Sequence, residues 1–433
     1  MLKKGKSCQI FQIKKKRFVW LDKVKFTLDG LIGYRYGSTF RVTNGEMVRV
    51  KKNELEDEFQ SREQGKDNRG LQDLDSNQKL SRDDIEKMKL TGMEGEEIIE
   101  QLIENSTTFK EKTEYAQEKW IKKKKKKHLQ IFTVLKPTAR LLCEMYHGKS
   151  PARICNMRVD TLAQILTYSN VHPGCNMAVV DTCNGLVVSS VLERLGGFGK
   201  VVHFFAGEMT RPAIDAMNFP EEYLDNLFNF PLNQINQISS SNSPHDQQNE
   251  SKSLDTDSKM ETQSESRTET QGDHKGESND KKEIESKEDD KPADTEKARG
   301  NNPQGGQGKK RHKDKEWREN SRLLRNKKIQ EGKQLLLQRN MDGLIVACKY
   351  HPTPIVLALL EYIAPSRPVV LYSQYKEPLM DCYALMRERG GLVSYRLTET
   401  WLREYQVLPM RTHPQIGMSG GGGYLLTATT IEK

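Results

Sequence analysis

The sequence lacks the residue spacings that bind metals or build a disulfide framework. Seven cysteines are scattered through its 433 residues, with no Cys-x-x-Cys pair and no histidine pair at zinc-ligand spacing: Cys8, Cys143, Cys155, Cys175, Cys183, Cys348 and Cys382. We read them as reduced thiols of an intracellular protein. A run of about 18 apolar residues is also missing, and lysines interrupt the N-terminal segment too often for a signal-peptide core. These absences exclude a zinc module, a secreted disulfide scaffold and a membrane-spanning protein, and they predict a soluble chain.

Apolar residues are scarce as well, at 35% of the chain, and the mean hydropathy is −0.77. Such a composition predicts more than one domain, together with a part that never enters a core. Lysine and arginine total 69 against 60 aspartates and glutamates, a net charge of +9, and the cations occur in blocks. This pattern favours a polyanionic partner, although a solvated surface with a high pI is the alternative.

The first predicted domain covers residues 1–155 and resembles a β-barrel in its pattern. Its β-rich runs alternate with turn residues, which indicates a small antiparallel sheet or barrel: residues 10–13, 17–21, 24–28, 31–37 and 38–45. A polar loop over 51–78 follows, and then three helical patterns and a strand: residues 81–92, 93–106, 107–130 and 128–136. Ser81, with Asp84 three positions on, is expected to cap the first of these helices. The third helical pattern ends in six consecutive lysines.

The second predicted domain covers residues 156–235 and 316–433. Strands alternate with helices, which indicates a parallel, doubly wound sheet of the Rossmann-like α/β class. A charged helix over 316–340 leads back into this alternation, and a glycine run, Gly420–Gly423, precedes what looks like a terminal β-hairpin that caps the sheet.

Residues 236–315 interrupt the second domain. They are rich in Ser, Gln, Glu, Asp and Lys and contain almost no large apolar residue. Such a segment cannot bury enough surface to offset its conformational entropy, so we predict a disordered insertion. Its basic end, residues 308–315, could act as a nuclear-import signal or simply solubilise the segment.

A degenerate motif follows the first strand of the second domain. Nucleotide-binding Rossmann-like folds place glycines there, because glycines let the backbone and a helix N-terminus approach the ligand, and methyltransferases use an acidic residue followed by Gly-x-Gly-x-Gly. Here Asp181 is present, but Cys183 and Val187 replace the outer glycines and only Gly185 remains. We expect the branched Val187 side chain to exclude a methyl donor sterically.

The following strands lack the carboxylates that a donor site and a catalytic centre would use. Phe204, Phe205 and Ala206 stand where a ribose-binding carboxylate is expected, and the nearby Glu208 is a single loop residue. No carboxylate occurs between Leu344 and Pro354. His351 could serve as a base, but a histidine between lysine and prolines is more often structural. We therefore assign no catalytic, cofactor-binding or metal-binding residue to this chain.

Several segments resemble one family closely. They are MRVDTLAQIL, LIENSTTFKEKTEYAQEKWIKKKKKK, HPTPIVLALLEYIAPSRPVVLYSQYKEPL, RERGG, TETWLREYQVLP and MSGGGGYLL. These segments are similar to the non-catalytic subunit of the eukaryotic tRNA (adenine-N1)-methyltransferase that acts on position 58, and the resemblance covers nearly the whole chain outside the insertion.

This resemblance implies an N-terminal β-barrel and a Rossmann-like domain without a donor site. It implies a heterotetramer of two such chains with two catalytic subunits, in the nucleus, in which the catalytic subunit binds S-adenosylmethionine and methylates N1 of the adenine while this chain positions the tRNA. Against the family pattern, we expect an opening barrel strand and a basic C-terminal tail to be missing; loss of the strand would expose an unpaired edge.

A subunit that positions tRNA needs cations along one face. The strongest candidates are the six lysines Lys122, Lys123, Lys124, Lys125, Lys126 and Lys127. Because a helix directs them all round its axis, only some can reach one RNA surface, and a solvated charge run is the alternative. Further candidates for RNA contact are Lys136, Arg140, Arg158, Arg387, Arg389, Arg396 and Arg403; Arg158 could instead pair with a carboxylate of a partner subunit.

Three aromatic residues near the end of the chain are candidates for the interface with a partner: Trp401, Tyr405 and Tyr424. The alternative is that they belong to this chain's own core. Two other functions stay open at this point. One is a stand-alone S-adenosylmethionine-dependent RNA methyltransferase, and the other is a translation-related scaffold whose insertion recruits partners.

Overall fold

The computed structural model describes residues 1–4, 7–21, 24–43, 45–50, 77–91, 93, 95–207, 209, 211–236, 238, 306–407 and 412–432. The chain divides into two compact units. One comprises Met1–Asn233 with Glu331–Lys433, and the other comprises Gln234–Gln330.

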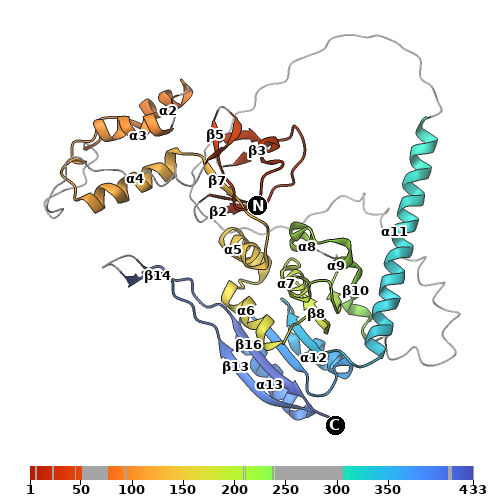
Figure 1. The fold of residues 1–433 in the computed structure, drawn as a ribbon. Coiled ribbons are helices and arrows are strands. Elements are labelled where there is room, and N and C mark those ends of the chain that lie inside the picture. The colour runs from red at the N-terminus through yellow and green to blue at the C-terminus, as the bar shows by residue number, and fades with distance from the viewer. Residues whose placement is uncertain are drawn as a thin grey trace, which may run out of the picture. The chain divides into compact units, whose positions relative to one another are not determined.

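The N-terminal region is an antiparallel five-stranded sheet accompanied by a separate two-stranded ribbon (Figure 1). The sheet has the order β2-β1-β7-β5-β6, and the ribbon is β3-β4: β1 (Leu2–Lys4), β2 (Ser7–Gln9), β3 (Phe18–Leu21), β4 (Val24–Thr27), β5 (Thr39–Thr43), β6 (Glu46–Val50) and β7 (Ile131–Val134). Sheet and ribbon share one apolar core that includes Phe26, Phe40 and Phe132. The predicted antiparallel β-rich domain is therefore confirmed.

Two predicted strands of this region are not formed. Residues 10–13 have no regular secondary structure, because β2 ends before them at Gln9. Residues 31–37 follow a short 3-10 helix, η1 (Asp29–Leu31), and continue as turns. Gly33 and Gly37 adopt φ values of 89° and 91°, a left-handed conformation that no strand residue uses. The apolar residues of this segment indicated a strand, but its two glycines adopt turn conformations that end regular strand geometry.

Three helices join β6 to β7: α2 (Arg82–Leu90), α3 (Gly95–Glu104) and α4 (Glu114–His128). Ser81 and Asp84 form the predicted capping box of α2, each accepting a hydrogen bond from the other's backbone N–H. α3 packs against α4, and the Phe109 and Trp120 rings meet at 5.0 Å. The lysine run is helical, as predicted, because it continues α4.

The second region is built around a seven-stranded sheet of order β10-β9-β8-β11-β12-β16-β13. Its strands are β8 (Asn176–Asp181), β9 (Lys200–Phe205), β10 (Leu227–Pro231), β11 (Gly343–Ala347), β12 (Pro368–Ser373), β13 (Leu392–Glu399) and β16 (Tyr424–Thr430). The five strands from β10 to β12 are parallel, and β16 pairs antiparallel with both β12 and β13. The predicted Rossmann-like α/β sheet is confirmed.

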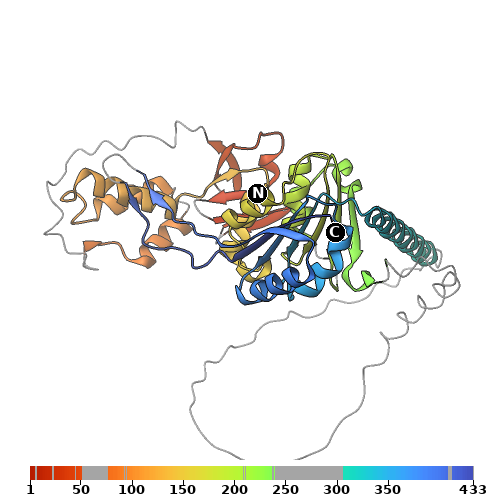
Figure 2. The ribbon, with the colours of Figure 1, turned by 90° about the horizontal axis from the view of Figure 1, so that it is seen from below.

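Helices cover both faces of this sheet (Figures 1 and 2). One face carries α5 (Ala139–Lys149), α6 (Val159–Tyr168) and α7 (Leu186–Leu195), and the other carries α12 (Pro352–Leu359) and α13 (Glu377–Arg389). Alternate residues of β8 serve the two faces, so that Met177 and Val179 pack with α5–α7. Short elements complete the fold: η3 (Pro151–Ile154), α8 (Pro212–Met217), α9 (Glu221–Asp225), η4 (Leu232–Gln234), η5 (Leu360–Tyr362), β14 (Tyr405–Gln406) and β15 (His413–Pro414).

The end of the chain corrects the predicted terminal hairpin. β16 does not cap the sheet; it lies inside it, between β12 and β13. A small β14–β15 hairpin lies between β13 and β16 in the sequence. The apolar and threonine side chains of β16 fit its interior position, because both faces of the strand carry buried residues.

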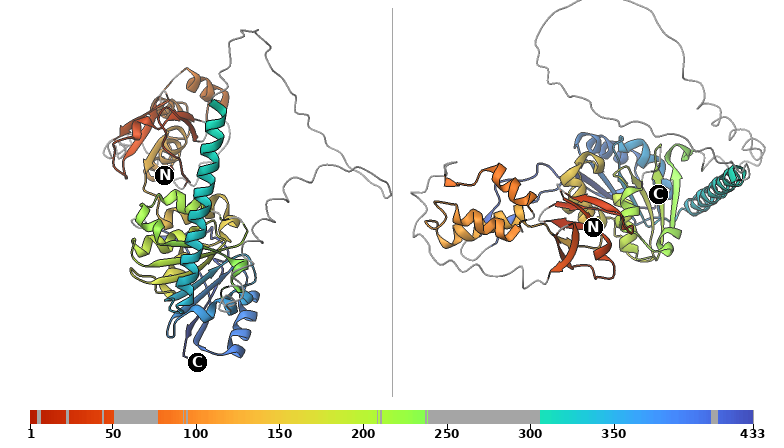
Figure 3. Two further views of the ribbon diagram at one scale, coloured as in Figure 1. Left: turned by 90° about the vertical axis from the view of Figure 1, so that its right-hand side faces the viewer. Right: turned by 90° about the horizontal axis from the view of Figure 1, so that it is seen from above.

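The predicted insertion, 236–315, falls mostly outside the described residues. Helix α11 (Gly306–Leu337) is continuous and starts before Glu316, where the sequence pattern predicted its beginning (Figure 3). Its last turns belong to the first unit, where Leu335 and Leu336 are buried.

Candidate functional site

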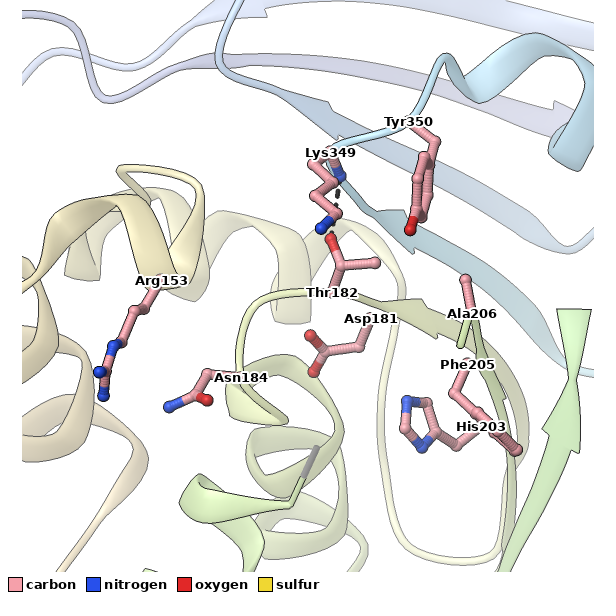
Figure 4. A pocket seen from close by; sticks show the side chains of 9 residues that line it. All are labelled: Arg153, Asp181, Thr182, Asn184, His203, Phe205, Ala206, Lys349 and Tyr350. Carbon is pink, nitrogen blue, oxygen red and sulfur yellow. Dashed lines mark hydrogen bonds between the residues drawn. The ribbon is translucent and has the colours of Figure 1, made fainter. Parts of the chain in front are cut away.

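A small cavity lies at the carboxyl ends of β8, β9 and β11. Its volume is about 250 Å³, and it is lined by Arg153, Asp181, Thr182, Asn184, His203, Phe205, Ala206, Lys349 and Tyr350 (Figure 4). β9 and β11 flank β8 on opposite sides, so the cavity occupies the topological switch point at which open α/β sheets bind ligands. The degenerate motif predicted from the sequence therefore lies where a donor site would be.

Asp181 is bound by its own chain. Its carboxylate is buried and accepts hydrogen bonds from three backbone N–H groups, those of Cys183, Val187 and Val188, the last two at 2.9 and 3.0 Å. Burial raises the pKa of Asp181, while His203 and the three N–H groups act in the opposite direction. The first N–H groups of α7, which would meet an anionic ligand in a nucleotide site, are thus already occupied.

The two residues that replace glycines lie in the core. Cys183 and Val187 are both fully buried among the α5–α7 side chains, and neither lines the cavity. The expected steric exclusion by the Val187 side chain is therefore wrong. Asn184 and Gly185, with φ of 61° and 76°, turn the chain sharply before α7 begins, and Val187 lies in the core after this turn.

His203 and Asn184 contribute buried polar atoms to the cavity. His203 is 1% exposed, its Nδ1 shares a hydrogen bond of 3.0 Å with Asn229 Oδ1, and its Nε2 has no partner among the described residues. Asn184 Nδ2 is also buried. The backbone N–H of Lys349 donates to Thr182 Oγ1 at 2.9 Å and ties the β8 and β11 loops together (Figure 4).

S-adenosylmethionine does not fit this arrangement. The volume of about 250 Å³ is below the range of about 300–1,000 Å³ typical of small-molecule sites. Phe205 and Ala206 line the cavity where a ribose-binding carboxylate was sought, and Glu208 lies outside the described residues.

His351 is positioned as a structural residue. It precedes the first turn of α12 as its N-cap, and its Nε2 lies 3.7 Å from Asp381 Oδ2 on α13. It does not line the cavity. Within the described residues, no cluster of three or more histidine, cysteine or acidic side chains is arranged to hold a metal ion.

Arg158 holds the C-terminal part of the fold together. Its guanidinium is 5% exposed and makes five hydrogen bonds, two to Asp160 and three to Ser419 Oγ, Gly420 O and Thr400 O, at 2.8 to 3.2 Å. A Cβ on Gly422 would lie 2.7 Å from Arg158 Nη2, which explains a glycine there. All the donors of Arg158 are engaged inside the chain, which argues against its predicted contact with RNA.

The lysine run divides into engaged and exposed members. Lys122 pairs with Glu118, and Lys124 Nζ lies 5.0 Å from the Trp120 ring centroid, where burial and then the charges of Lys127 and Lys123 lower its pKa. Lys123 and Lys127 are exposed, Lys125 is half-buried, and the Lys126 side chain is outside the description. Among the described side chains of the run, Lys123 and Lys127 thus remain available for a polyanion, whereas Lys122 is exposed but paired with Glu118.

The other predicted cations do not form one strip. Lys136 is exposed, and Arg140 is paired with Glu144 at 2.8 Å. Arg387 and Arg389 are exposed on α13, while Arg403 is half-buried. Arg396 is exposed on β13, beside the bulge that interrupts the pairing of β13 with β16, whereas Arg387 and Arg389 belong to α13.

The predicted interface aromatics are mostly outside the core. Trp401 is 69% and Tyr405 is 55% exposed, whereas Tyr424 is half-buried in β16. The alternative that Trp401 and Tyr405 are core residues of this chain is wrong. Val407 and Ile416 beside them are exposed too, at 76% and 97%, so an apolar surface is concentrated around the β14–β15 hairpin.

A second exposed aromatic surface was not assigned any role from the sequence. Phe18 and Trp20 of β3 are 56% and 60% exposed, and the cationic turn Lys14–Arg17 precedes them. The alternation KKKRFVW contained the signal, because two aromatic residues flank one valine in a strand that follows four cations. None of the helices in the described part of the chain has the length and apolar character to span a membrane.

The chain is similar to curated proteins over nearly its whole length. The chain is 41% identical over 442 residues to the tRNA (adenine(58)-N(1))-methyltransferase non-catalytic subunit TRM6 of Mus musculus, an alignment that covers 100% of this chain and 87% of the relative. It is 29% identical to the corresponding subunit of Dictyostelium discoideum, covering 99% and 77%.

Among solved structures, the fold is similar to the tRNA (m1A58) methyltransferase TrmI of Aquifex aeolicus, with a TM-score of 0.38, 11% identity, and coverage of 70% of this chain and 79% of that one. The family model described as Gcd10p matches residues 1–267. This chain therefore belongs to the Gcd10p family, together with the non-catalytic subunits that it matches.

Proposed function

We propose that this chain is the non-catalytic, tRNA-binding subunit of a tRNA (adenine-N1)-methyltransferase complex. It positions tRNA so that a separate catalytic subunit, which binds S-adenosylmethionine, methylates N1 of adenine 58 in the T-loop. The complex is a heterotetramer of two such chains with two catalytic subunits, and it works in the nucleus. The names of the relatives in Mus musculus and Dictyostelium discoideum support the non-catalytic assignment.

The observation that carries this proposal is the internal use of Asp181. A donor site needs free N–H groups at the start of the helix that follows the first strand. Here the Asp181 carboxylate accepts from Cys183, Val187 and Val188 instead. Because the acid and the helix N-terminus satisfy each other, the fold is kept without the ligand.

Calorimetric titration of S-adenosylmethionine tests this division of labour. We expect no heat of binding with this chain alone, and one donor per catalytic chain in the reconstituted complex. Saturable binding to the isolated chain would instead support a stand-alone methyltransferase. The same complex, mass-measured in solution, should contain two copies of each subunit.

A methylation assay separates the positioning role from that of a scaffold. The complex should methylate a tRNA transcript that carries adenine at position 58 and leave a transcript with guanine there unmodified. Deleting residues 236–315 should leave this activity intact. Loss of activity on that deletion would support the scaffold alternative, in which the insertion recruits partners.

Nuclear import is tested through the basic cluster at residues 308–315. Replacing its five cations by glutamine in a fluorescent fusion should shift the protein out of the nucleus: Lys309, Lys310, Arg311, Lys313 and Lys315. A control fusion with Lys327 and Lys328 replaced keeps the cluster. An unchanged nuclear signal with the cluster replaced would contradict its role in import.

A further inference from the structure

The outward face of the β3–β4 ribbon displays aromatic side chains that its own fold does not need. In β3 the side chains alternate, so Val19 is 7% exposed and packs in the core with Phe26, while Phe18 and Trp20 point outward at 56% and 60% exposure. Trp20 has no ring or cation contact among the described residues. Two large exposed aromatic side chains on a short ribbon indicate a binding surface.

A cationic turn leads directly into this face and is fixed in place. Lys14, Lys15, Lys16 and Arg17 are all exposed, and the Arg17 N–H donates to Lys14 O at 3.2 Å. The Lys16 N–H donates to both carboxylate oxygens of Asp29, at 3.1 and 3.0 Å. The backbone of the turn is thus anchored to the first residue of η1, while its four charged side chains stay in solvent.

A further cation lies on the face itself. Lys25 is directly opposite Trp20 in the ribbon, and its Nζ lies 4.6 Å from the ring centroid of Phe18. The Phe18 ring is therefore partly covered by a cation, whereas Trp20 offers an open ring surface. Aromatic rings interleaved with cations are the arrangement with which proteins bind single-stranded nucleic acids.

We propose that this face binds unpaired RNA nucleotides, with Trp20 stacked on a base and the turn Lys14–Arg17 contacting the neighbouring phosphates. Lys25 covers the Phe18 ring, and the four exposed cations of the turn Lys14–Arg17 directly precede β3 in the chain. This combination suits a polyanion with exposed π faces and disfavours an apolar protein surface. The inference rests on the proposed function, because it gives the tRNA-binding subunit a contact separate from α4. Base stacking tolerates any base, so the site selects unpaired nucleotides rather than a sequence.

The test uses the full chain in complex with its catalytic partner and two probes, a tRNA transcript and a short oligouridylate. Fluorescence anisotropy at several salt concentrations gives the affinity and the salt slope. Trp20→Ala should weaken binding of both probes about 5- to 100-fold without changing the salt slope. Trp20→Phe should retain most of the affinity, because the smaller ring still stacks, and Phe198→Ala, an exposed aromatic residue elsewhere, should bind like the wild type.

The cationic turn is tested with the double change Lys15→Gln and Arg17→Gln. Each phosphate contact that is lost should lower the salt slope by about one. In the wild type, stacking should quench tryptophan fluorescence when oligouridylate is added, and Trp20→Phe should remove that quenching while binding persists.

Three outcomes separate the possibilities. Equal affinity of Trp20→Ala and the wild type for both probes would overturn this inference and leave the proposed function untouched. Loss of the catalytic subunit from the Trp20→Ala complex would show that the face is a protein interface, which also overturns it. A wild-type complex that binds oligouridylate with Trp20 quenching but does not bind tRNA would contradict the proposed function and support the site.

Discussion

The cavity beside Asp181 and the outer face of the β3–β4 ribbon use their polar and aromatic groups in opposite ways. At the cavity, the Asp181 carboxylate accepts hydrogen bonds from N–H groups at the start of α7, and Lys349 N–H donates to Thr182. Groups that could bind a ligand are therefore already bound within the chain. At the ribbon, two aromatic rings and the side chains of a cationic turn are left in solvent, and only the backbone of the turn is bound, to Asp29. A fold can therefore keep the architecture of a ligand site while the polar groups of that site bind one another. Exposed aromatic and cationic side chains elsewhere on the surface stay available for a partner.

The largest effect should come from Arg158, because it holds α6 and the segments around β16 together on the inward side of this comparison. Arg158→Ala leaves Asp160 without its buried partner and removes three hydrogen bonds to residues 400–420. Loss of one partner of a buried ion pair costs about 3–5 kcal/mol. The free energy of unfolding, measured by denaturant titration, should fall by that amount.

Two control variants make this test specific. Arg389→Ala, at an exposed position on α13, should change the free energy of unfolding by less than about 0.5 kcal/mol. Arg158→Lys keeps the charge but loses the planar guanidinium, so its free energy of unfolding should lie between those of Arg158→Ala and Arg389→Ala. An Arg158→Ala protein that is as stable as the wild type but binds tRNA more weakly would restore Arg158 as an RNA contact.

Asp181→Asn sharpens the comparison at the cavity. The amide can accept through one oxygen only, so at least one of the three N–H groups that now bind the carboxylate meets an NH₂ group instead. A buried N–H without an acceptor costs about 1–3 kcal/mol. Unfolding experiments should show this loss, while Asp215→Asn on an exposed turn of α8 should not. Unchanged stability would mean that Asp181 is kept for another purpose than satisfying α7.

How far the sequence predicted the structure depends on whether the deciding interaction was local. The α/β alternation, the α2 capping box and the helical lysine run follow from patterns within a few residues, and they are confirmed. The sequence showed Asp181 only as part of a motif. Its hydrogen bonds to the N–H groups of Cys183, Val187 and Val188 depend on the turn at Asn184 and Gly185, whose left-handed φ values the sequence pattern did not reveal.

Non-local contacts explain what sequence analysis missed. Arg158 donates a hydrogen bond to Gly420 O, 262 positions away in the sequence. The sequence alone gave no sign of this partner, so Arg158 was predicted to be a surface cation. β16 inserts between β12 and β13, and no local signal reveals that order. Trp20 faces solvent because Val19 and Phe26 pack into the N-terminal core from the other side of the ribbon. That packing involves residues from several strands and cannot be predicted from β3 alone.

His128 is a buried polar residue at the C-terminal end of α4, directly after the lysine run. It adds a second case of a polar group on the buried side of the comparison. The ring is 6% exposed, and neither nitrogen has a partner among the described residues. Burial, and then the charges of Lys89, Lys127 and Lys124, lowers its pKa to about 4. The unfolded state therefore binds a proton between about pH 6.5 and pH 4 that the folded state does not, so stability is present above pH 6.5 and is lost as the pH falls through this window.

The size of this loss should be up to about 2 kcal/mol at pH 5 relative to pH 8. His128→Gln should flatten the dependence of the unfolding free energy on pH over this window, whereas His172→Gln, at an exposed position, should leave it as it is in the wild type. Parallel curves for the wild type and His128→Gln would show that other groups cause the acid sensitivity.

The smallest effect should come from the lysine run, where the surface side of the comparison can be divided further. Lys122 and Lys124 already have partners in Glu118 and Trp120, whereas Lys123 and Lys127 are exposed. Lys123→Gln with Lys127→Gln should lower the salt slope of tRNA binding by about two, one for each phosphate contact, and leave stability unchanged. Lys122→Gln should change the slope less, because its charge is already balanced by Glu118. Equal slopes for the double variant and the wild type would make the run a solvated helix face, and the contacts with tRNA would then have to come from the ribbon and the remaining exposed cations.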